Sequence, residues 1–170
     1  MNLSQEHRRF LLFEQCAIPT AINLVVNGLI AWLLNRSTTT IPIWGGSSVA
    51  VDLLGTSFLL PFIVCLAVSP NVKKKVKSGD LSPLSTDRLP IFLWYKKSLW
   101  LRAIFLGIAG VVFAGIPVVW ILGIAQARFI PLMSFVVFKA FWAAAIASII
   151  TPIVGWWALA NASEKTKSVI

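Results

Sequence analysis

The sequence predicts an all-α membrane protein with four transmembrane helices and both termini in the cytoplasm. Of its 170 residues, 58% are hydrophobic, whereas soluble domains contain roughly 45–50%. The apolar residues lie in four long blocks, and basic residues flank these blocks unequally on the two sides. Because four spans of about 20 residues use about half the chain, we expect a single membrane domain over residues 1–170.

The first span is predicted over residues 10–34, and the polar residues Asn35 and Arg36 follow it. This block is longer than the roughly 7–15 apolar residues of a signal peptide, so we expect it to be retained as a helix. The second span is predicted over residues 48–69. Pro70 comes directly after it, and proline commonly follows a helix end.

A basic segment over residues 70–100 is predicted to be a cytoplasmic loop. It begins with a lysine cluster and ends with aromatic residues that suit the membrane interface. The third span is predicted over residues 101–125 and the fourth over residues 131–159, with a short turn between them. Glycines in the third span and alanines in the fourth lead us to expect close packing of these two helices, or a dimer contact.

The distribution of lysine and arginine predicts the orientation, because basic residues concentrate in short cytoplasmic segments beside spans. Twelve lie in the N-terminal segment, the middle loop with its flanks and the C-terminal tail, whereas two lie in the opposite loops. The twelve are Arg8, Arg9, Lys73, Lys74, Lys75, Lys77, Arg88, Lys96, Lys97, Arg102, Lys165 and Lys167, and the two are Arg36 and Arg128. We therefore expect both termini and the middle loop to be cytoplasmic, in a multi-pass protein of the plasma (inner) membrane.

The two predicted helical hairpins resemble one another in sequence. Trp32 and Trp120 are 88 residues apart, and two pairs of prolines have offsets of 89 and 91. These pairs are Pro42 with Pro131 and Pro61 with Pro152. A duplicated hairpin would give a parallel repeat about an axis along the membrane normal. The alternative is convergence, since tryptophan and proline are common near membrane interfaces.

Four ionisable residues fall within or at the edges of the predicted spans: Glu14, Asp52, Arg102 and Lys139. An Asp, Lys or Arg at the centre of a span costs about 2.5–3.5 kcal/mol, so each charge needs a partner or a role. Matching depths predict two ion pairs, Glu14–Arg102 near the cytoplasm and Asp52–Lys139 near the outside. Alternatively, one carboxylate carries a proton or cation, and a neighbouring cation would oppose this role by stabilising the charged form.

Polar residues also form a stripe on the first span. Thr20, Asn23 and Asn27 share one helix face. Asparagine side chains can hydrogen-bond between membrane helices, so we interpret the stripe as an interhelical contact. A substrate path is the alternative interpretation.

The net charge of +9 would suggest nucleic-acid binding in a soluble protein, but here orientation and anionic lipids explain it. Lys73, Lys74, Lys75 and Lys77 are predicted to bind lipid headgroups, and no nucleic-acid partner is expected. The only histidine, His7, is expected to be solvated, and Cys16 and Cys65 lie in apolar stretches. These residues predict no metal site and no cofactor.

No catalytic constellation is visible in the sequence, so we expect no enzymatic activity. The main hypothesis is a structural or accessory membrane subunit or scaffold that contacts lipids and either a second copy or another membrane protein. The alternative hypothesis is a small proton- or cation-coupled transporter that uses Glu14 or Asp52.

Overall fold

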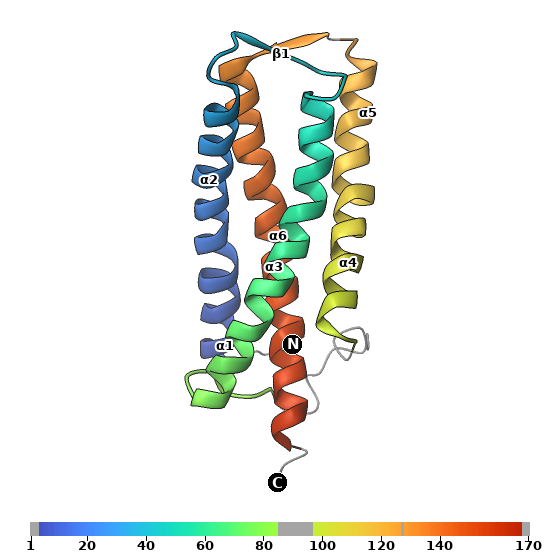
Figure 1. Cartoon of the computed structure of the whole chain (residues 1–170). Coiled ribbons are helices and arrows are strands. Elements are labelled where there is room, and N and C mark those ends of the chain that lie inside the picture. Colours follow the sequence, from blue (N-terminus) through green and yellow to red (C-terminus); the bar gives the residue numbers. More distant parts are fainter. Residues whose placement is uncertain (1–3, 85–96, 127, 168–170) are drawn as a thin grey trace.

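The computed structural model describes residues 4–84, 97–126 and 128–167 (Figure 1). Within these residues, four helices are long and apolar enough to cross a membrane, and they support the prediction of a multi-pass protein. They contain 31, 30, 26 and 33 residues and extend over Gln5–Asn35, Val49–Ser78, Leu99–Ile124 and Leu132–Glu164. Each exceeds the roughly 20 residues needed to cross a bilayer. Arg88, Lys96 and the side chains of Lys165 and Lys167, all used in the orientation argument, lie outside the described residues.

The first and third long helices each contain a π-helical segment. The first comprises α1 (Gln5–Arg9), η1 (Phe10–Ala17) and α2 (Ile18–Asn35), and the third comprises α4 (Leu99–Gly110), η4 (Val111–Gly115) and α5 (Ile116–Ile124). Pro19 and Pro117 each follow a π segment by two residues. Proline lacks an N–H and crowds the carbonyl four residues earlier, and the wider π turns relieve this crowding at Pro19 and Pro117. Helices α3 and α6 pass through Pro61, Pro70 and Pro152 without a π turn.

The second and fourth helices extend beyond the predicted spans. The second, α3 (Val49–Ser78), begins after the N-cap Ser48, whose Oγ accepts a hydrogen bond from the Val51 N–H. It continues through Pro70 and ends at Gly79, whose φ of 82° gives the left-handed conformation that glycine tolerates. The lysine cluster therefore lies on the last turns of α3 and not in a loop. The fourth helix, α6, runs over Leu132–Lys167.

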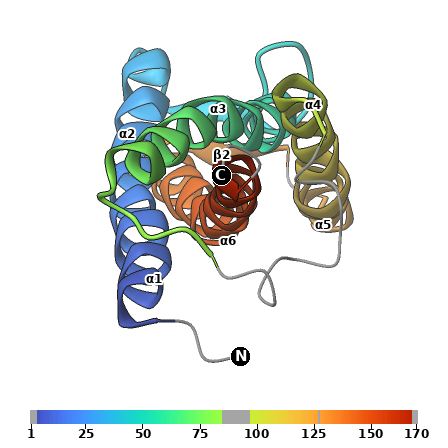
Figure 2. The ribbon, with the colours of Figure 1, turned by 90° about the horizontal axis from the view of Figure 1, so that it is seen from below.

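The central helices α3 and α6 cross one another, and the first and third helices lie on opposite sides of this pair (Figures 1 and 2). Helix α2 packs mainly on α6, although α3 is the helix that follows it in the chain. Similarly, α4 packs mainly on α3. The two ends of the molecule differ. One end carries the two strands and is called the strand end below. The opposite end carries α1 and the last, lysine-containing turns of α3 and is called the basic end.

Small residues allow close approach at both of these side contacts. A Cβ at Gly110 would lie 2.0 Å from the Ser57 carbonyl oxygen of α3, and Gly107 similarly faces the Phe58 ring. Gly28 of α2 faces Ala140 of α6. The third helix therefore uses its glycines against α3, whereas we had expected close packing against the fourth helix. Which helix the third helix packs against depends on the crossing of α3 and α6, and the sequence does not reveal this crossing.

A two-stranded antiparallel sheet joins the two hairpins at the strand end. Strand β1 (Thr40–Pro42) pairs with β2 (Phe129–Pro131), and Ile41 is opposite Ile130. Hydrogen bonds from the Ile43 N–H to the Arg128 oxygen and from the Leu132 N–H to the Thr39 oxygen flank this pair. Pro42 and Pro131 therefore occupy non-hydrogen-bonded positions of the ladder, where no N–H donor is needed.

Candidate functional site

The polar side chains within the bundle gather along a groove between α2 and α3. This α2–α3 groove has a volume of about 510 Å³, and residues of α6 form its floor. Its lining is mainly apolar, and its polar members are Asn23, Asn27, Asp52, Thr56, Lys139 and Thr151. Concave apolar sites with a few convergent polar groups are typical of binding sites.

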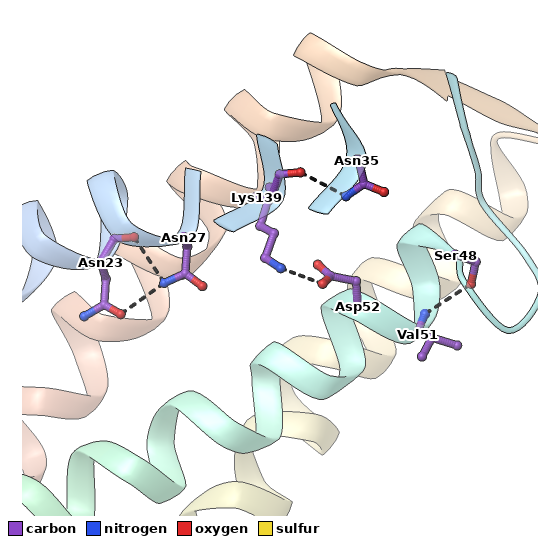
Figure 3. A network of polar contacts seen from close by, with 8 residues as sticks. Asn23, Asn27, Asn35, Ser48, Val51, Asp52 and Lys139 are labelled. Carbon is purple, nitrogen blue, oxygen red and sulfur yellow. Dashed lines mark hydrogen bonds and ion pairs between the residues drawn. The ribbon is translucent and has the colours of Figure 1, made fainter. Parts of the chain in front are cut away.

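An ion pair between residues that line the groove links α6, at its floor, to α3, at its wall (Figure 3). Lys139 Nζ donates a hydrogen bond of 2.5 Å to Asp52 Oδ1, so the structure contains the Asp52–Lys139 pair that the sequence predicts. The Lys139 side chain is only 4% exposed, whereas that of Asp52 is 31% exposed. Because an unpaired buried cation is very unfavourable, Asp52 is required to stabilise the charge of Lys139.

Two oxygen atoms of residues that line the groove lack hydrogen-bond partners among the described residues. Asp52 Oδ2 and Thr151 Oγ1 are both buried in the groove region and accept or donate no hydrogen bond there. A buried polar atom without a partner costs about 1–3 kcal/mol. Both atoms are enclosed, so the hydrogen-bonding groups that the groove presents are those of its exposed polar side chains.

The asparagine stripe does not make the interhelical hydrogen bonds that we expected. Asn23 Nδ2 donates to the Pro19 oxygen at 2.9 Å, and Asn27 Nδ2 donates to the Asn23 main-chain oxygen at 3.1 Å. Both bonds stay within α2 (Figure 3 shows the Asn23–Asn27 contact). Asn23 and Asn27 line the groove, whereas Thr20 Oγ1 is buried without a partner among the described residues. The prediction fails because α2 and α3 are separated by the groove, so the asparagines have no α3 side chain within reach.

The predicted Glu14–Arg102 pair is wrong. Glu14 instead forms an ion pair with Lys75, and both side chains are partly exposed, at 38% and 44%. Lys75 reaches Glu14 because α3 continues past Pro70 and passes beside η1 at the basic end. Matching depth was therefore insufficient to identify the partner.

Arg102 lies elsewhere, at the start of α4, and is only 5% exposed. It lines a separate cavity of about 360 Å³ together with Lys73 and Lys97. The lysine cluster is thus divided, because Lys74 and Lys75 line the cavity beside Glu14, while Lys77 is exposed.

Further cavities continue the α2–α3 groove in both directions. Asp52 also lines a cavity of about 300 Å³ at the strand end. At the basic end, a cavity of about 610 Å³ is lined by Glu14, Ile18 and Lys75. A row of cavities therefore follows the space between the first and second long helices, with one ion pair near each end.

The N-terminal segment is fixed to the segment that follows α3. His7 is buried, and its Nε2 lies 2.8 Å from the Ser82 carbonyl oxygen. The Glu6 carboxylate accepts hydrogen bonds from the Ser82 N–H and hydroxyl. We expected His7 to be solvated, and this prediction is wrong because the chain after Gly79 folds back over α1.

The described residues contain no group of three or more His, Cys, Asp or Glu side chains that could hold a metal ion. The two cysteines, Cys16 and Cys65, are free thiols. The residues that line the groove provide hydrogen-bonding groups and one ion pair along an apolar surface.

No protein-family model matches this chain, and comparisons with curated proteins and with solved structures also find no match.

Proposed function

We propose that this chain is an accessory subunit that binds one transmembrane helix of a partner membrane protein in the α2–α3 groove. The observation that carries the proposal is the groove itself, with its apolar walls and the partly exposed Asp52 side chain. This is the structural or accessory function expected from the sequence, now assigned to one surface.

The dimensions of the groove suit a helix that crosses the bilayer. Along α3 its lining extends from Asp52 to Val68, a rise of about 24 Å at 1.5 Å per residue. Because a bilayer hydrocarbon core is about 30 Å thick, an occupant of the groove would follow most of that depth. The first helix also presents much of its apolar surface outward, since only 6% of its apolar window is buried.

The polar groups define the chemistry of the partner helix. Asp52 and Lys139 neutralise one another, so a charged partner residue is not required. The Asp52 side chain is 31% exposed where it lines the groove, and its carboxylate can accept a further hydrogen bond from a Ser, Thr, Asn or Gln side chain. We therefore expect an apolar partner helix with one such residue at the depth of Asp52.

Photo-crosslinking in native membranes tests this proposal. A photoreactive residue at Leu59, which lines the groove and is 52% exposed, should give one crosslink to a membrane-spanning segment of another protein. The matched control is Phe113, which is 82% exposed on the third helix and should give no such product. A Cβ at Gly55 meets nothing within 4 Å, so Gly55→Leu should fill the groove without disturbing the fold and abolish the crosslink.

Crosslinks from Leu59 to lipid alone, or to a second copy of this chain, would contradict the proposal. Crosslinking that persists unchanged in Gly55→Leu would also contradict it, because the partner would then contact Leu59 without entering the groove.

The row of cavities supports a second candidate function, a proton- or cation-coupled transporter. Its favouring observation is the position of Asp52–Lys139 near one end of the row and Glu14–Lys75 near the other. Glu14 is the better candidate to exchange a proton, because its pair is more exposed. Purified protein in liposomes should then dissipate a proton gradient, and Glu14→Gln should abolish this flux. Flux equal to protein-free liposomes would contradict the transporter.

We also propose that the two hairpins arose by duplication and that the basic end faces the cytoplasm of a cell whose plasma (inner) membrane holds the protein. The strand register supports the duplication, because Ile41 pairs with Ile130, its equivalent at the sequence offset of 89. The packing of α2 on α6 and of α4 on α3 has the same symmetry. Lys73, Lys74, Lys75 and Lys77 at the basic end support the orientation.

A further inference from the structure

A separate cavity at the basic end has three cations among its lining residues. Arg102 of α4, Lys73 of α3 and Lys97 before α4 all line this space of about 360 Å³, called the Arg102 cavity below. No carboxylate of a described residue is among its lining residues. Three positive side chains that share one cavity repel one another, so the cavity is suited to hold an anion.

Arg102 is the buried member of this group. It is only 5% exposed, and its Nε is buried and has no hydrogen-bond partner among the described residues. Glu14, the counter-ion expected from the sequence, is paired with Lys75 instead. A buried guanidinium without an anion is unfavourable, so an anionic acceptor from outside the described residues would stabilise it.

The start of α4 adds further attraction for an anion. Ser98, the N-cap of this 12-residue helix, and Leu99 both line the cavity. The first N–H groups of a helix lack partners within the helix and carry a partial positive charge, so phosphate groups bind readily at such positions. Ser69 and Ser98 also bring hydroxyl groups to the lining.

The cavity lies at the start of an apolar helix, because Ser98, Leu99 and Arg102 are among its lining residues. In the same helix Trp100 is 62% exposed, and Ile104 and Ile108 are 44% and 52% exposed. A tryptophan at the start of a span is typical of the membrane–water interface.

We propose that the Arg102 cavity binds a phosphate group, provided either by the headgroup of an anionic phospholipid or by a free phosphate anion. Arg102 donates to the phosphate oxygens from within the cavity, and Lys73 and Lys97 neutralise its charge from the exposed rim. This site is independent of the α2–α3 groove, so the failure of either proposal leaves the other unaffected.

The proposal is tested on the full chain in detergent micelles by native mass spectrometry and thermal unfolding. Three probes are compared: dioleoyl-phosphatidylglycerol, dioleoyl-phosphatidylcholine and inorganic phosphate. We expect phosphatidylglycerol to be retained and to raise the Tm, while phosphatidylcholine does neither. If inorganic phosphate raises the Tm equally and displaces phosphatidylglycerol, the ligand is the free anion, and if it does neither, the ligand is the lipid headgroup.

Lys73→Gln and Lys77→Gln form a matched pair, because both residues are exposed on the same helix and only Lys73 lines the cavity. Lys73→Gln and Lys97→Gln should each weaken binding of the preferred probe about fivefold, the value expected for one basic residue near an anionic headgroup. Lys77→Gln should leave binding unchanged. Arg102→Gln should weaken it about tenfold or more, as for loss of a hydrogen bond to a charged group.

Equal effects of Lys73→Gln and Lys77→Gln would overturn the proposal, since diffuse surface charge would then explain the binding. Equal retention of phosphatidylglycerol and phosphatidylcholine, without any effect of phosphate, would overturn it too. These outcomes do not depend on Arg102→Gln, so the test remains decisive if that variant fails to fold.

Discussion

Lys139 Nζ lies 2.5 Å from Asp52 Oδ1, and this contact joins residues that are 87 positions apart in the chain. It connects the two central helices, α6 and α3, beside the apolar α2–α3 groove. The pair therefore both stabilises the crossing of these helices and supplies the polar part of the candidate site.

Removing one partner of this pair should be more harmful than removing both. Asp52→Asn leaves the buried Lys139 without its carboxylate, and we expect a loss of about 3–5 kcal/mol in the free energy of unfolding. The double variant Asp52→Asn with Lys139→Met should recover most of this loss. Reversible denaturant unfolding in mixed micelles measures both values. If the loss in the double variant equals the sum of the losses in Asp52→Asn alone and Lys139→Met alone, the two residues are not coupled.

The Glu14–Lys75 pair should contribute much less. Its side chains are 38% and 44% exposed, and exposed ion pairs typically contribute about 0–1 kcal/mol. Glu14→Gln should therefore change the free energy of unfolding by less than about 1 kcal/mol, and salt should reduce the difference. The same micelle assay, run beside Asp52→Asn, provides the comparison. An effect of Glu14→Gln as large as that of Asp52→Asn would contradict the assignment of this pair to an exposed site.

Gly110 should tolerate no larger side chain. An added Cβ would lie 2.0 Å from the Ser57 carbonyl oxygen, so α4 and α3 would have to separate. We expect Gly110→Ala to cost about 1–3 kcal/mol, as for other overpacked sites. Gly55→Ala is the control, because its Cβ meets nothing within 4 Å. Equal stability of the two variants would show that α3 and α4 do not approach closely at Gly110.

The strand register predicts a specific disulfide. Thr40 and Pro131 are opposite one another at a position between ladder hydrogen bonds, where Cα atoms are about 4.5 Å apart and a disulfide can form. Thr40→Cys with Pro131→Cys should therefore oxidise readily in a background without Cys16 and Cys65. Thr38→Cys with Pro131→Cys, two residues out of register, should oxidise poorly. Mobility on non-reducing gels distinguishes them, and the opposite order would disprove the register.

The proposed orientation predicts opposite labelling of the two ends. In the same cysteine-free background, Ser78→Cys at the basic end should react with a membrane-impermeant maleimide only after the membrane is opened. Thr39→Cys at the strand end should react in intact cells. Both positions are exposed, so burial does not limit the reaction. Labelling of both positions from one side would be incompatible with four membrane crossings.

Hydropathy alone was sufficient to predict the four apolar helices, because each residue makes its own contribution to the free energy of transfer into an apolar phase. It located the first span at residues 10–34 and the third at 101–125, close to the helices Gln5–Asn35 and Leu99–Ile124. It gave poorer boundaries for α3, since Pro70 suggested an end that the helix passes by eight residues.

The charged residues separate what the sequence determined from what only the tertiary structure decided. The depth of a residue in the membrane follows from its position in the chain. For Asp52 and Lys139, matching depth was enough to predict the ion pair, because α3 and α6 are neighbours. For Glu14 and Arg102 it failed, because η1 lies beside α6 and the end of α3, while Arg102 faces a different cavity. Which helices touch depends on close packing between residues far apart in sequence, such as Gly110 on Ser57 and Gly28 on Ala140. This packing created the α2–α3 groove and left Arg102 without the carboxylate that the sequence had assigned to it.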